Sequence, residues 1–185
     1  MFSLRVDDEV SLELAEMHHA QELYDLTDRN REHLRPWMPW EPMTKSVEDT
    51  KGFLTQIRND YAAGKAFHCN LRYRGAIVGG MGLHSMDFFN RTCELGYWID
   101  AAHSGKGIVT RATRALVTAA FAEYGFERVA IQADVDNARS RAVPERLGFT
   151  FEGTTRAAKR VNDRQVDSVT YAMLAADWDA GTLPG

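Results

Sequence analysis

Residues 93–135 hold the pattern that most constrains the fold of this chain: a strand, a glycine-rich turn, a helix and a second strand. Residues 93–100 are typical of a strand, residues 110–124 predict an amphipathic helix, and the apolar residues of 129–135 alternate onto one strand face. Two strands joined through a helix are expected to lie parallel and side by side. Where such strands splay apart, their unpaired backbone groups line a cleft and can pair with the amides of a bound molecule.

The turn contains two glycines that flank a lysine, Gly105-Lys106-Gly107. Glycines at a strand-to-helix turn leave backbone N–H groups accessible, and the start of a helix adds roughly half a positive charge. The turn therefore predicts a seat for a phosphate or pyrophosphate. It is not a Walker A loop, because Asp100 stands where the first glycine is required and Gly107 where Ser or Thr must hold magnesium, and no G-x-G-x-x-G fingerprint is present. A solvated loop is the alternative interpretation.

A second segment, residues 137–149, follows the strand at 129–135. Asn137 is suited to cap the start of a short helix and Gly148 to end it, and Ser140 lies three residues after the cap. Asn137 and Ser140 are therefore expected to face the cleft where the two strands part. The alternative is that Asn137 serves only as a cap and that Ser140 is only solvated.

Together the two segments resemble the GNAT superfamily of acetyl-CoA-dependent N-acetyltransferases, and more narrowly its RimJ/RimL branch of ribosomal-protein N-terminal acetyltransferases. The Trp- and Pro-containing residues 31–40, the strand at 94–98 and the aromatic end at 171–178 extend the resemblance over nearly the whole chain. The resemblance implies a single acetyltransferase domain over residues 1–185. It implies an α/β fold with a central mixed antiparallel and parallel sheet, splayed at the acetyl-CoA site and flanked by helices.

Acetyl-CoA is the cofactor that the resemblance implies, with no metal. Its binding residues would come from the first strand, the turn and the second segment: Trp98, Ile99, Ser104, Gly105, Lys106, Gly107, Ile108, Val109, Thr110, Asn137 and Ser140. Two positions depart from the family's usual turn. Ser104 stands in place of Gln or Arg, which removes a charged contact, and Val109 stands in place of Gly or Ala, which narrows the approach of backbone to phosphate. Arg139 and Arg141, with Lys106, are further candidates for phosphate contacts.

Transfer of an acetyl group from a thioester to an amine requires a neutral amine, a stabilised carbonyl oxygen and a proton for the leaving thiolate. A strand N–H near Trp98 and Ile99 can polarise the thioester carbonyl. Ser140 is the candidate donor to the thiolate, because the segment 137–149 has no tyrosine to act as the general acid that is common elsewhere in the superfamily.

Glu94 is the candidate base, acting directly or through water. Strand alternation puts Glu94, Gly96 and Trp98 on one face, and Gly96 leaves room beside the carboxylate. A protein α-amino group has a pKa of about 7.7–8.0, against about 10.4 for lysine, so an N-terminal acceptor needs only a modest base. A solvated or salt-bridged carboxylate is the alternative for Glu94, and His84 and His103 are weaker candidates for the base.

The acceptor is expected to bind along Trp37, Met38 and Trp40, together with Glu94 and Tyr97. A proline-fixed loop with two Trp and a Met is too apolar to serve only as a solvated connection. The resemblance also implies that this loop lies near the acceptor. The alternative is that the two Trp side chains fill the core.

Composition excludes several other classes of protein. With 185 residues, a net charge of −4 and no basic stripe, one soluble domain is expected and nucleic acid is not expected as a partner. Cys69 and Cys93 lie far apart without CxxC or His spacing, so neither a disulfide framework nor a zinc site is predicted. The sequence shows no secretory h-region and no apolar stretch of membrane-spanning length, so a cytoplasmic protein without membrane contact is expected.

Along the chain, the patterns predict elements in the order β-α-α-β-β-β-α-β-α-β-β. The segments are a strand at 10–14, a helix at 18–34, no helix at 36–42, a helix from a cap at Ser46 to Gly64, three strands between 66 and 100, a helix at 109–124, a strand at 128–135, a short helix at 138–147 and strands at 149–158 and 165–174.

Three functions remain open at this point. The first is acetylation of a protein N-terminal α-amine, and the second is acetylation of a small amine such as an antibiotic, a polyamine or an amino acid. The third is a non-catalytic acyl-CoA-binding protein, favoured by Ser104 and Val109. An apolar, aromatic acceptor loop argues against aminoglycosides, which suit deep acidic pockets. The resemblance alone implies a homodimer.

Overall fold

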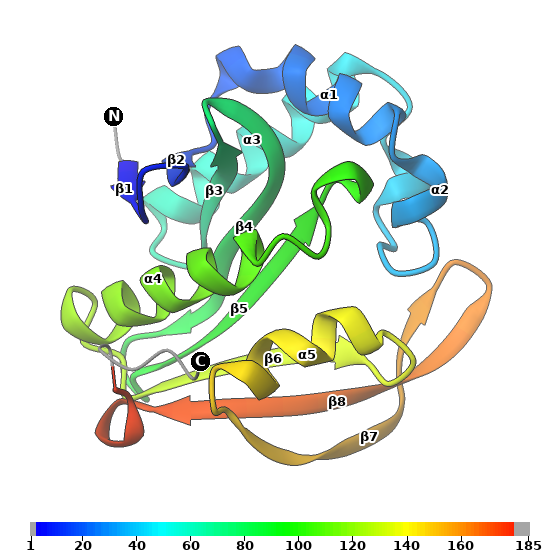
Figure 1. The fold of residues 1–185 in the computed structure, drawn as a ribbon. Coiled ribbons are helices and arrows are strands. Elements are labelled where there is room, and N and C mark those ends of the chain that lie inside the picture. The colour runs from blue at the N-terminus through cyan, green and yellow to red at the C-terminus, as the bar shows by residue number, and fades with distance from the viewer. Residues whose placement is uncertain (1–2, 180–185) are drawn as a thin grey trace.

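The computed structural model describes residues 3–179, and its centre is a mixed eight-stranded sheet with helices on both faces (Figure 1). The strands lie in the order β1-β2-β3-β4-β5-β6-β8-β7. Their bounds are β1 Ser3–Arg5, β2 Val10–Leu14, β3 Phe67–Tyr73, β4 Ala76–Asp87, β5 Thr92–Ile99, β6 Arg128–Asp134, β7 Thr150–Val161 and β8 Arg164–Leu174. The α-helices are α1 Ala20–Asp28, α2 Arg31–Leu34, α3 Val47–Ala62, α4 Ile108–Ala122 and α5 Ala138–Arg146, with short 3-10 turns η1 Met17–His19, η2 Glu41–Met43, η3 Ala101–His103 and η4 Ala175–Asp177.

The pairing of β5 with β6 confirms the predicted parallel neighbours. All other neighbouring strands described are antiparallel, whereas β5 and β6 pair in parallel from Thr92 opposite Arg128 to Glu94 opposite Ala130. Beyond Glu94 the two strands part, and their ribbons diverge in Figure 1. Residues 95–99 of β5 therefore remain paired with β4 on one side. On their other side they face the gap between β5 and β6.

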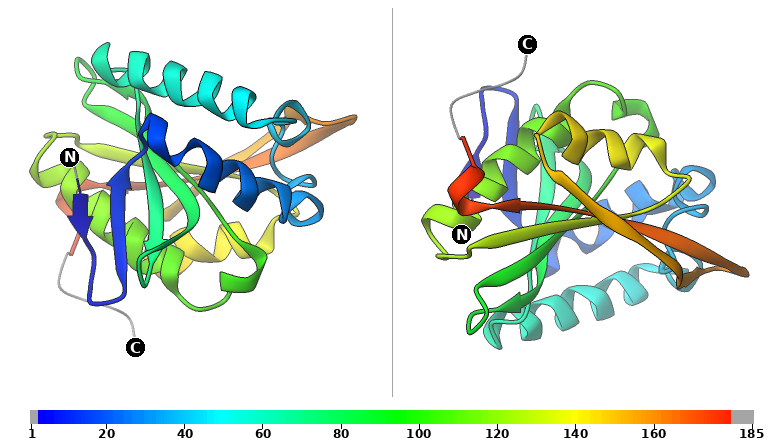
Figure 2. Two further views of the ribbon diagram at one scale, coloured as in Figure 1. Left: turned by 90° about the horizontal axis from the view of Figure 1, so that it is seen from above. Right: turned by 90° about the horizontal axis from the view of Figure 1, so that it is seen from below.

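Helices cover the two faces of the sheet as two separate layers. Figure 2 shows α1 and α3 on one face and α4 and α5 on the other. The larger core lies under α4, where Leu116 and Ala120 pack on the sheet, and the smaller one joins Leu26 and Leu54 of α1 and α3 to Ile77 of β4. A residue and its immediate neighbour along a strand therefore belong to different layers.

Most predicted boundaries are confirmed to within a few residues. The three strands between 66 and 100, the breaks near Gly75 and at residues 88–91, the turn at 162–163 and the short helix α5 are all present. Ser46 caps α3 by accepting a hydrogen bond from the Asp49 amide. Strand β7 continues to Val161, three residues past its expected end.

The predicted helix at 18–34 is wrong as one piece, because the chain turns at Asn30 between α1 and α2. The side-chain amide of Asn30 donates to the Leu26 carbonyl, and its carbonyl oxygen accepts from the backbone N–H of Ala101 at 3.0 Å. This buried contact joins segments far apart in sequence, so local periodicity could not reveal it.

Two smaller expectations also fail. Strand β1 was missed, because its three residues are too few to show a period. Within residues 36–42 the prolines do exclude an α-helix, but η2 includes Pro42 in its first turn, a position that tolerates a missing backbone N–H.

Candidate active site

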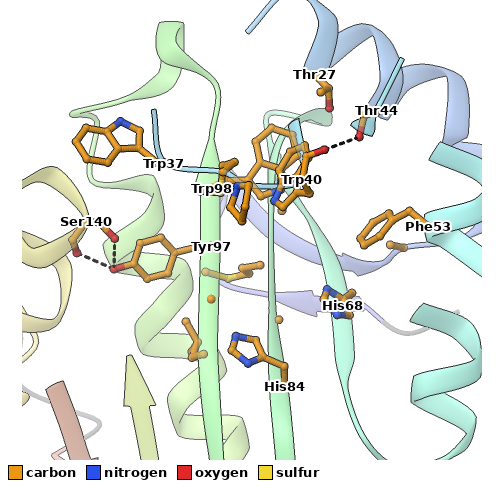
Figure 3. A pocket seen from close by; sticks show the side chains of 18 of the residues that line it. Thr27, Trp37, Trp40, Thr44, Phe53, His68, His84, Tyr97, Trp98 and Ser140 are labelled. Atoms are coloured by element: carbon orange, nitrogen blue, oxygen red, sulfur yellow. Dashed lines mark hydrogen bonds between the residues drawn. The ribbon is translucent and has the colours of Figure 1, made fainter. Parts of the chain in front are cut away.

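A cavity of about 600 Å³ lies where β5 and β6 part. Its walls come from the loop after α2, from α3, from the sheet and from the start of α5 (Figure 3). The predicted site residues that line it are Trp37, Met38, Trp40, Tyr97, Trp98, Asn137 and Ser140. The cavity therefore connects the two faces of the sheet through the gap between the strands.

The cavity floor depends on glycines of β4 and β5. A Cβ at Gly80 would lie 2.7 Å from Nε1 of Trp98, and a Cβ at Gly96 would lie 2.9 Å from Nε2 of His84. Both distances are too short for any side chain. Trp98 and His84 can therefore lie close to the sheet only because these positions carry no side chain.

The Gly105–Gly107 turn leads directly into α4. Gly105 and Gly107 have φ of 79° and 71°, the left-handed region that glycine adopts without strain. The first backbone hydrogen bond of α4 runs from Arg111 to Gly107, so the amides of residues 108–110 precede the helical ladder. The local geometry is that predicted for an anion seat.

The side chains around this turn are distributed between core and solvent. Ile108 is buried, Val109 packs partly against the main core, and Lys106 is exposed. The Ser104 hydroxyl donates to the backbone carbonyl of Asp100 at 3.3 Å. Ser104 therefore fixes the start of the turn.

Asp100 holds the turn from beneath. Its carboxylate accepts from the Ala102 amide and lies 3.1 Å from Nδ1 of His103. Burial alone would raise the pKa of Asp100, but the hydrogen bonds from Ala102 and His103 outweigh it and the pKa lies below its ordinary value. His103 is thus occupied at the turn, outside the lining of the cavity.

The start of α5 faces the gap as expected. Asn137 accepts a hydrogen bond from the Ser140 amide at 3.1 Å, which confirms the cap, and Gly148 ends the helix with φ of 77°. Of the arginines considered for phosphate contacts, Arg139 is exposed, whereas Arg141 donates to the Tyr171 hydroxyl and the Val135 carbonyl. Arg141 is therefore already engaged within the protein.

Tyr97 contacts Ser140 directly, which sequence reasoning missed. The Tyr97 hydroxyl donates to the backbone carbonyl of Ser140 at 2.7 Å and lies 3.5 Å from its hydroxyl oxygen, as Figure 3 shows. Burial raises the pKa of Tyr97, although the hydrogen bond with Ser140 opposes this. Strand alternation could have predicted the contact between Tyr97 and Ser140, because Tyr97 must point to the sheet face opposite to that of Trp98. A neutral phenol therefore lies beside the candidate acid.

Glu94 lies at the edge of the site rather than in its wall. The described lining of the cavity includes His84 and His68 but not Glu94, whose carboxylate is 3.8 Å from Nδ1 of His84. His84 fills the room that Gly96 was expected to leave for the carboxylate. His68 was missed, although its register opposite Gly82 puts it on the same sheet face.

The loop after α2 is fixed by a buried carboxylate. Glu41 is fully buried and pairs with Arg31 and with Arg35, each at 2.9 Å. Burial by itself would raise the pKa of Glu41, but the hydrogen bonds from Arg35 and Arg31 outweigh it and lower the pKa. The hairpin between β7 and β8 adds a bond from Asn162 to the Arg35 carbonyl at 2.6 Å.

This fixed loop presents its aromatic side chains to the cavity. The rings of Trp40 and Trp98 meet edge to face with centroids 5.7 Å apart. Figure 3 shows Trp37 on the same side of Trp98 as Tyr97 and Ser140. Trp37 and Trp40 are half-buried and lie outside both buried core clusters. The alternative that they fill the core is therefore wrong.

Two negative findings apply to residues 3–179. No helix there has the length and apolarity to cross a membrane. No group of three or more His, Cys, Asp or Glu there is arranged to hold a metal ion.

A splayed sheet, a glycine-rich turn at a helix start and a cavity with aromatic walls are the features expected of an acyltransferase of the coenzyme A-dependent class. The family model described as "Acetyltransferase (GNAT) domain" matches residues 10–150. The chain belongs to the GNAT acetyltransferase family, whose members transfer acetyl from acetyl-CoA to an amine.

The chain is also similar to three named acetyltransferases. The Bacillus subtilis protein YdaF, with the provisional name of ribosomal N-acetyltransferase, is 37% identical over 180 residues, 97% of this chain and 98% of YdaF. The structure of RimL, a ribosomal L7/L12 α-N-protein acetyltransferase in complex with coenzyme A, has a TM-score of 0.89 and 26% identity over 94% of this chain and 98% of that one. The microcin C7 self-immunity acetyltransferase MccE, in complex with acetyl-CoA and AMP, has a TM-score of 0.88 and 31% identity over 92% and 95%.

Proposed function

We propose that this acetyltransferase acetylates the N-terminal α-amine of a protein, with a ribosomal protein as the expected substrate class. The observation that carries the proposal is the cavity itself, which extends from Asn137 and Ser140 at the start of α5 to a wall of Trp37, Met38 and Trp40. An extended, flexible peptide end can enter such a cavity. The names of YdaF and RimL support the same class of acceptor.

On the coenzyme side, the amides of residues 105–110 would bind the pyrophosphate, with Ser104 holding the turn in place. The free edge of β5 at Trp98 and Ile99 would pair with the pantetheine amides and polarise the thioester carbonyl. Asn137 would complete this wall from the start of α5. Val109 packs toward the core rather than across the turn, which favours coenzyme binding.

On the acceptor side, Ser140 would donate a proton to the leaving thiolate, with the Tyr97 hydroxyl beside it. Glu94 would promote removal of the amine proton at the opposite edge of the gap. The α-amine has a pKa of about 7.7–8.0, so this proton leaves at modest cost near neutral pH.

The test is a product assay with a mixed panel of amines. The protein is incubated with acetyl-CoA and ribosomal-protein N-terminal peptides, polyamines, amino acids and aminoglycosides, and products heavier by one acetyl group are sought by mass spectrometry. We expect acetylation on a peptide α-amine. The proposal fails if only a small molecule is acetylated. Coenzyme binding without any product would instead favour the non-catalytic alternative.

A second candidate acceptor is a small amine that carries a planar ring. Three indoles, of Trp37, Trp40 and Trp98, line the cavity, and flat aromatic groups stack on such walls. The AMP in the MccE complex carries such a planar ring. Quenching of tryptophan fluorescence by AMP, lost in Trp40→Ala, would support this candidate, and unchanged fluorescence would argue against it.

The sequence patterns also lead us to expect a cytoplasmic protein without a nucleic-acid partner, and the family resemblance leads us to expect a homodimer. Size-exclusion chromatography with light scattering would test the homodimer.

A further inference from the structure

The acceptor face of the sheet carries a His–Glu pair at the edge of the gap. His84 and Glu94 lie directly opposite each other on β4 and β5, and the ladder is interrupted immediately after His84 by a bulge in which Ser85 has φ of 50°. Directly opposed residues point to the same face, so the imidazole and the carboxylate meet there. Nδ1 of His84 is 3.8 Å from Oε2 of Glu94.

The other edge of the imidazole faces the cavity. Nε2 of His84 lies over Gly96. A Cβ atom at position 96 would be only 2.9 Å from this nitrogen. Gly96 and His84 both line the cavity, and Figure 3 shows the ring turned from β4 toward β5. Gly96 is two residues beyond Glu94, the last residue of β5 that pairs with β6. Nε2 therefore lies beside the point where the strands part.

We propose that His84 is the catalytic group that takes the proton from the acceptor ammonium, and that Glu94 is a positioning residue that acts through it. The carboxylate near Nδ1 favours the neutral tautomer that carries hydrogen on Nδ1, because that N–H dipole points toward a negative charge. Nε2 then presents its lone pair to the cavity. This inference rests on the proposed acetyl transfer to an amine and reassigns the base from the carboxylate to the imidazole.

The charges around His84 suit this role. Burial lowers the pKa of His84 below its ordinary 6.5, and the charge of Glu94 opposes this. On the neighbouring strand, burial and then the charge of His84 lower the pKa of His68 to about 4, opposed by Asp60 of α3. Near neutral pH both imidazoles are therefore uncharged, and among residues 3–179 the charge that acts on His84 is that of Glu94.

An imidazole is also the better proton acceptor of the two groups. A model imidazole has a pKa of about 6.5 and a model carboxyl about 4.3, against about 7.7–8.0 for an α-ammonium. For free groups, transfer to an imidazole is therefore the less uphill step, and the burial of His84 narrows this difference.

The proton balance of the reaction is complete with these groups. An ammonium acceptor gives one proton to Nε2 of His84, and the neutral amine attacks the thioester carbon, forming the C–N bond. The C–S bond then breaks and the coenzyme thiolate takes a proton from the Ser140 hydroxyl, while the new amide loses its second proton to that oxygen. His84 returns its proton to water.

The kinetic test compares His84→Gln with Glu94→Gln in kcat/KM for a peptide acceptor between pH 6 and 9.5, at saturating acetyl-CoA. We expect His84→Gln to lower kcat/KM about 100-fold at pH 7 and much less above pH 9, where the amine arrives neutral. Glu94→Gln should cost about 10-fold with the same pH trend. The matched control is His18→Gln, which removes an exposed histidine whose Nδ1 lies 3.4 Å from Glu16 outside the cavity, and it should leave the profile unchanged. A larger loss in Glu94→Gln than in His84→Gln, or a loss independent of pH, overturns the proposal.

A second test needs no acceptor and so is independent of the proposed substrate. Nitrogen-15 NMR of the ligand-free protein reports the tautomer and the pKa of each imidazole, with His84 assigned by its missing signals in His84→Gln, or in His84→Asn if that variant does not fold. We expect the proton on Nδ1, a bare Nε2 and a lower His84 pKa in Glu94→Gln, because a favourable negative charge is lost. A proton on Nε2, or a pKa unaffected by Glu94→Gln, would remove Glu94 from this role.

Discussion

The two sides of the cavity are built in different ways. The proposed coenzyme side is mainly one continuous stretch of chain, from β5 through the turn at 104–107 to α4, with Asn137 added from the start of α5. The groups that we propose to bind the coenzyme there are mainly backbone amides. The proposed acceptor side joins the loop after α2, the hairpin tip at 162–164 and side chains from three neighbouring strands. One side is specified by local conformation and the other by contacts between distant segments.

This difference suggests how the two sides respond to change. A conformational substitution at residues 104–107 should affect mainly the coenzyme, because the hydrogen bonds described for Ser104 and Gly107 run within residues 100–111. A substitution in the anchors of the loop should affect the acceptor alone. The following predictions test that separation, from the largest expected effect to the smallest.

The largest effect is expected for Gly107→Val. At φ of 71° a β-branched residue is strained, and its side chain would occupy the space in front of the amides. We expect the affinity for acetyl-CoA, measured by calorimetry, to fall more than about 100-fold, the scale of losing several charge-assisted hydrogen bonds. Gly75→Val is the matched control, since Gly75 has φ of 85°, also has open space around it and lies in the β3–β4 hairpin. Equal loss of affinity in both variants would mean that strain, not the anion seat, causes it.

Ser140→Ala should be next. We expect turnover to fall about 10- to 100-fold, the usual range for a lost general acid, with little change in coenzyme affinity. Pre-steady-state kinetics with acetyl-CoA and the peptide acceptor would separate the rate of acetyl transfer from the affinity for the coenzyme. Ser168→Ala is the control, because Ser168 is a buried serine of β8 that is not among the lining residues of the cavity and whose hydroxyl donates to the Ala133 carbonyl. Full turnover in Ser140→Ala, with a loss in Tyr97→Phe, would transfer the acid role to Tyr97.

Glu41→Gln should lower the free energy of unfolding and loosen the loop after α2, which forms part of the proposed acceptor side. The folded-state pKa of Glu41 lies below the ordinary 4.5, so its ion pairs stabilise the fold fully above that pH and lose their effect as pH falls through the folded-state pKa. At pH 7 we expect a loss of about 2 kcal/mol, reduced from the buried-pair range because Arg35 is largely exposed. Urea unfolding should show that the difference in unfolding free energy between the wild type and Glu41→Gln becomes smaller below pH 4.

The matched control for Glu41 is Glu152→Gln. Glu152 pairs with Arg128 through two hydrogen bonds but is 39% exposed, so its loss should cost less than about 1 kcal/mol. In Glu41→Gln the KM for the peptide should also rise severalfold while coenzyme affinity is retained. A fall in coenzyme affinity would show that the two sides are coupled.

The same contrast explains which features could be predicted from the sequence. The glycine turn, the Asn137 cap and the end of α5 at Gly148 are local signals, and all were found. No local signature marks Asn30 or Glu41. The side-chain oxygen of Asn30 accepts from an amide 71 residues away, and the buried carboxylate of Glu41 forms ion pairs with two arginines. His84 was visible in the sequence, but its position against Gly96 and Glu94 follows only from the strand register.

The smallest effect is expected for Asn162→Gly. Asn162 has φ of 53°, which glycine adopts freely, so the substitution removes the hydrogen bond to the Arg35 carbonyl with little added strain. One such bond contributes about 0.5–1.5 kcal/mol, so the peptide KM should rise about 2- to 10-fold while turnover and coenzyme affinity stay as they were. Asn90→Gly, which removes a side-chain bond to Asp87 in the β4–β5 hairpin, should change none of the three. If Asn162→Gly lowers coenzyme affinity instead, the hairpin acts on the gap between the strands and the two sides of the cavity are one mechanical unit.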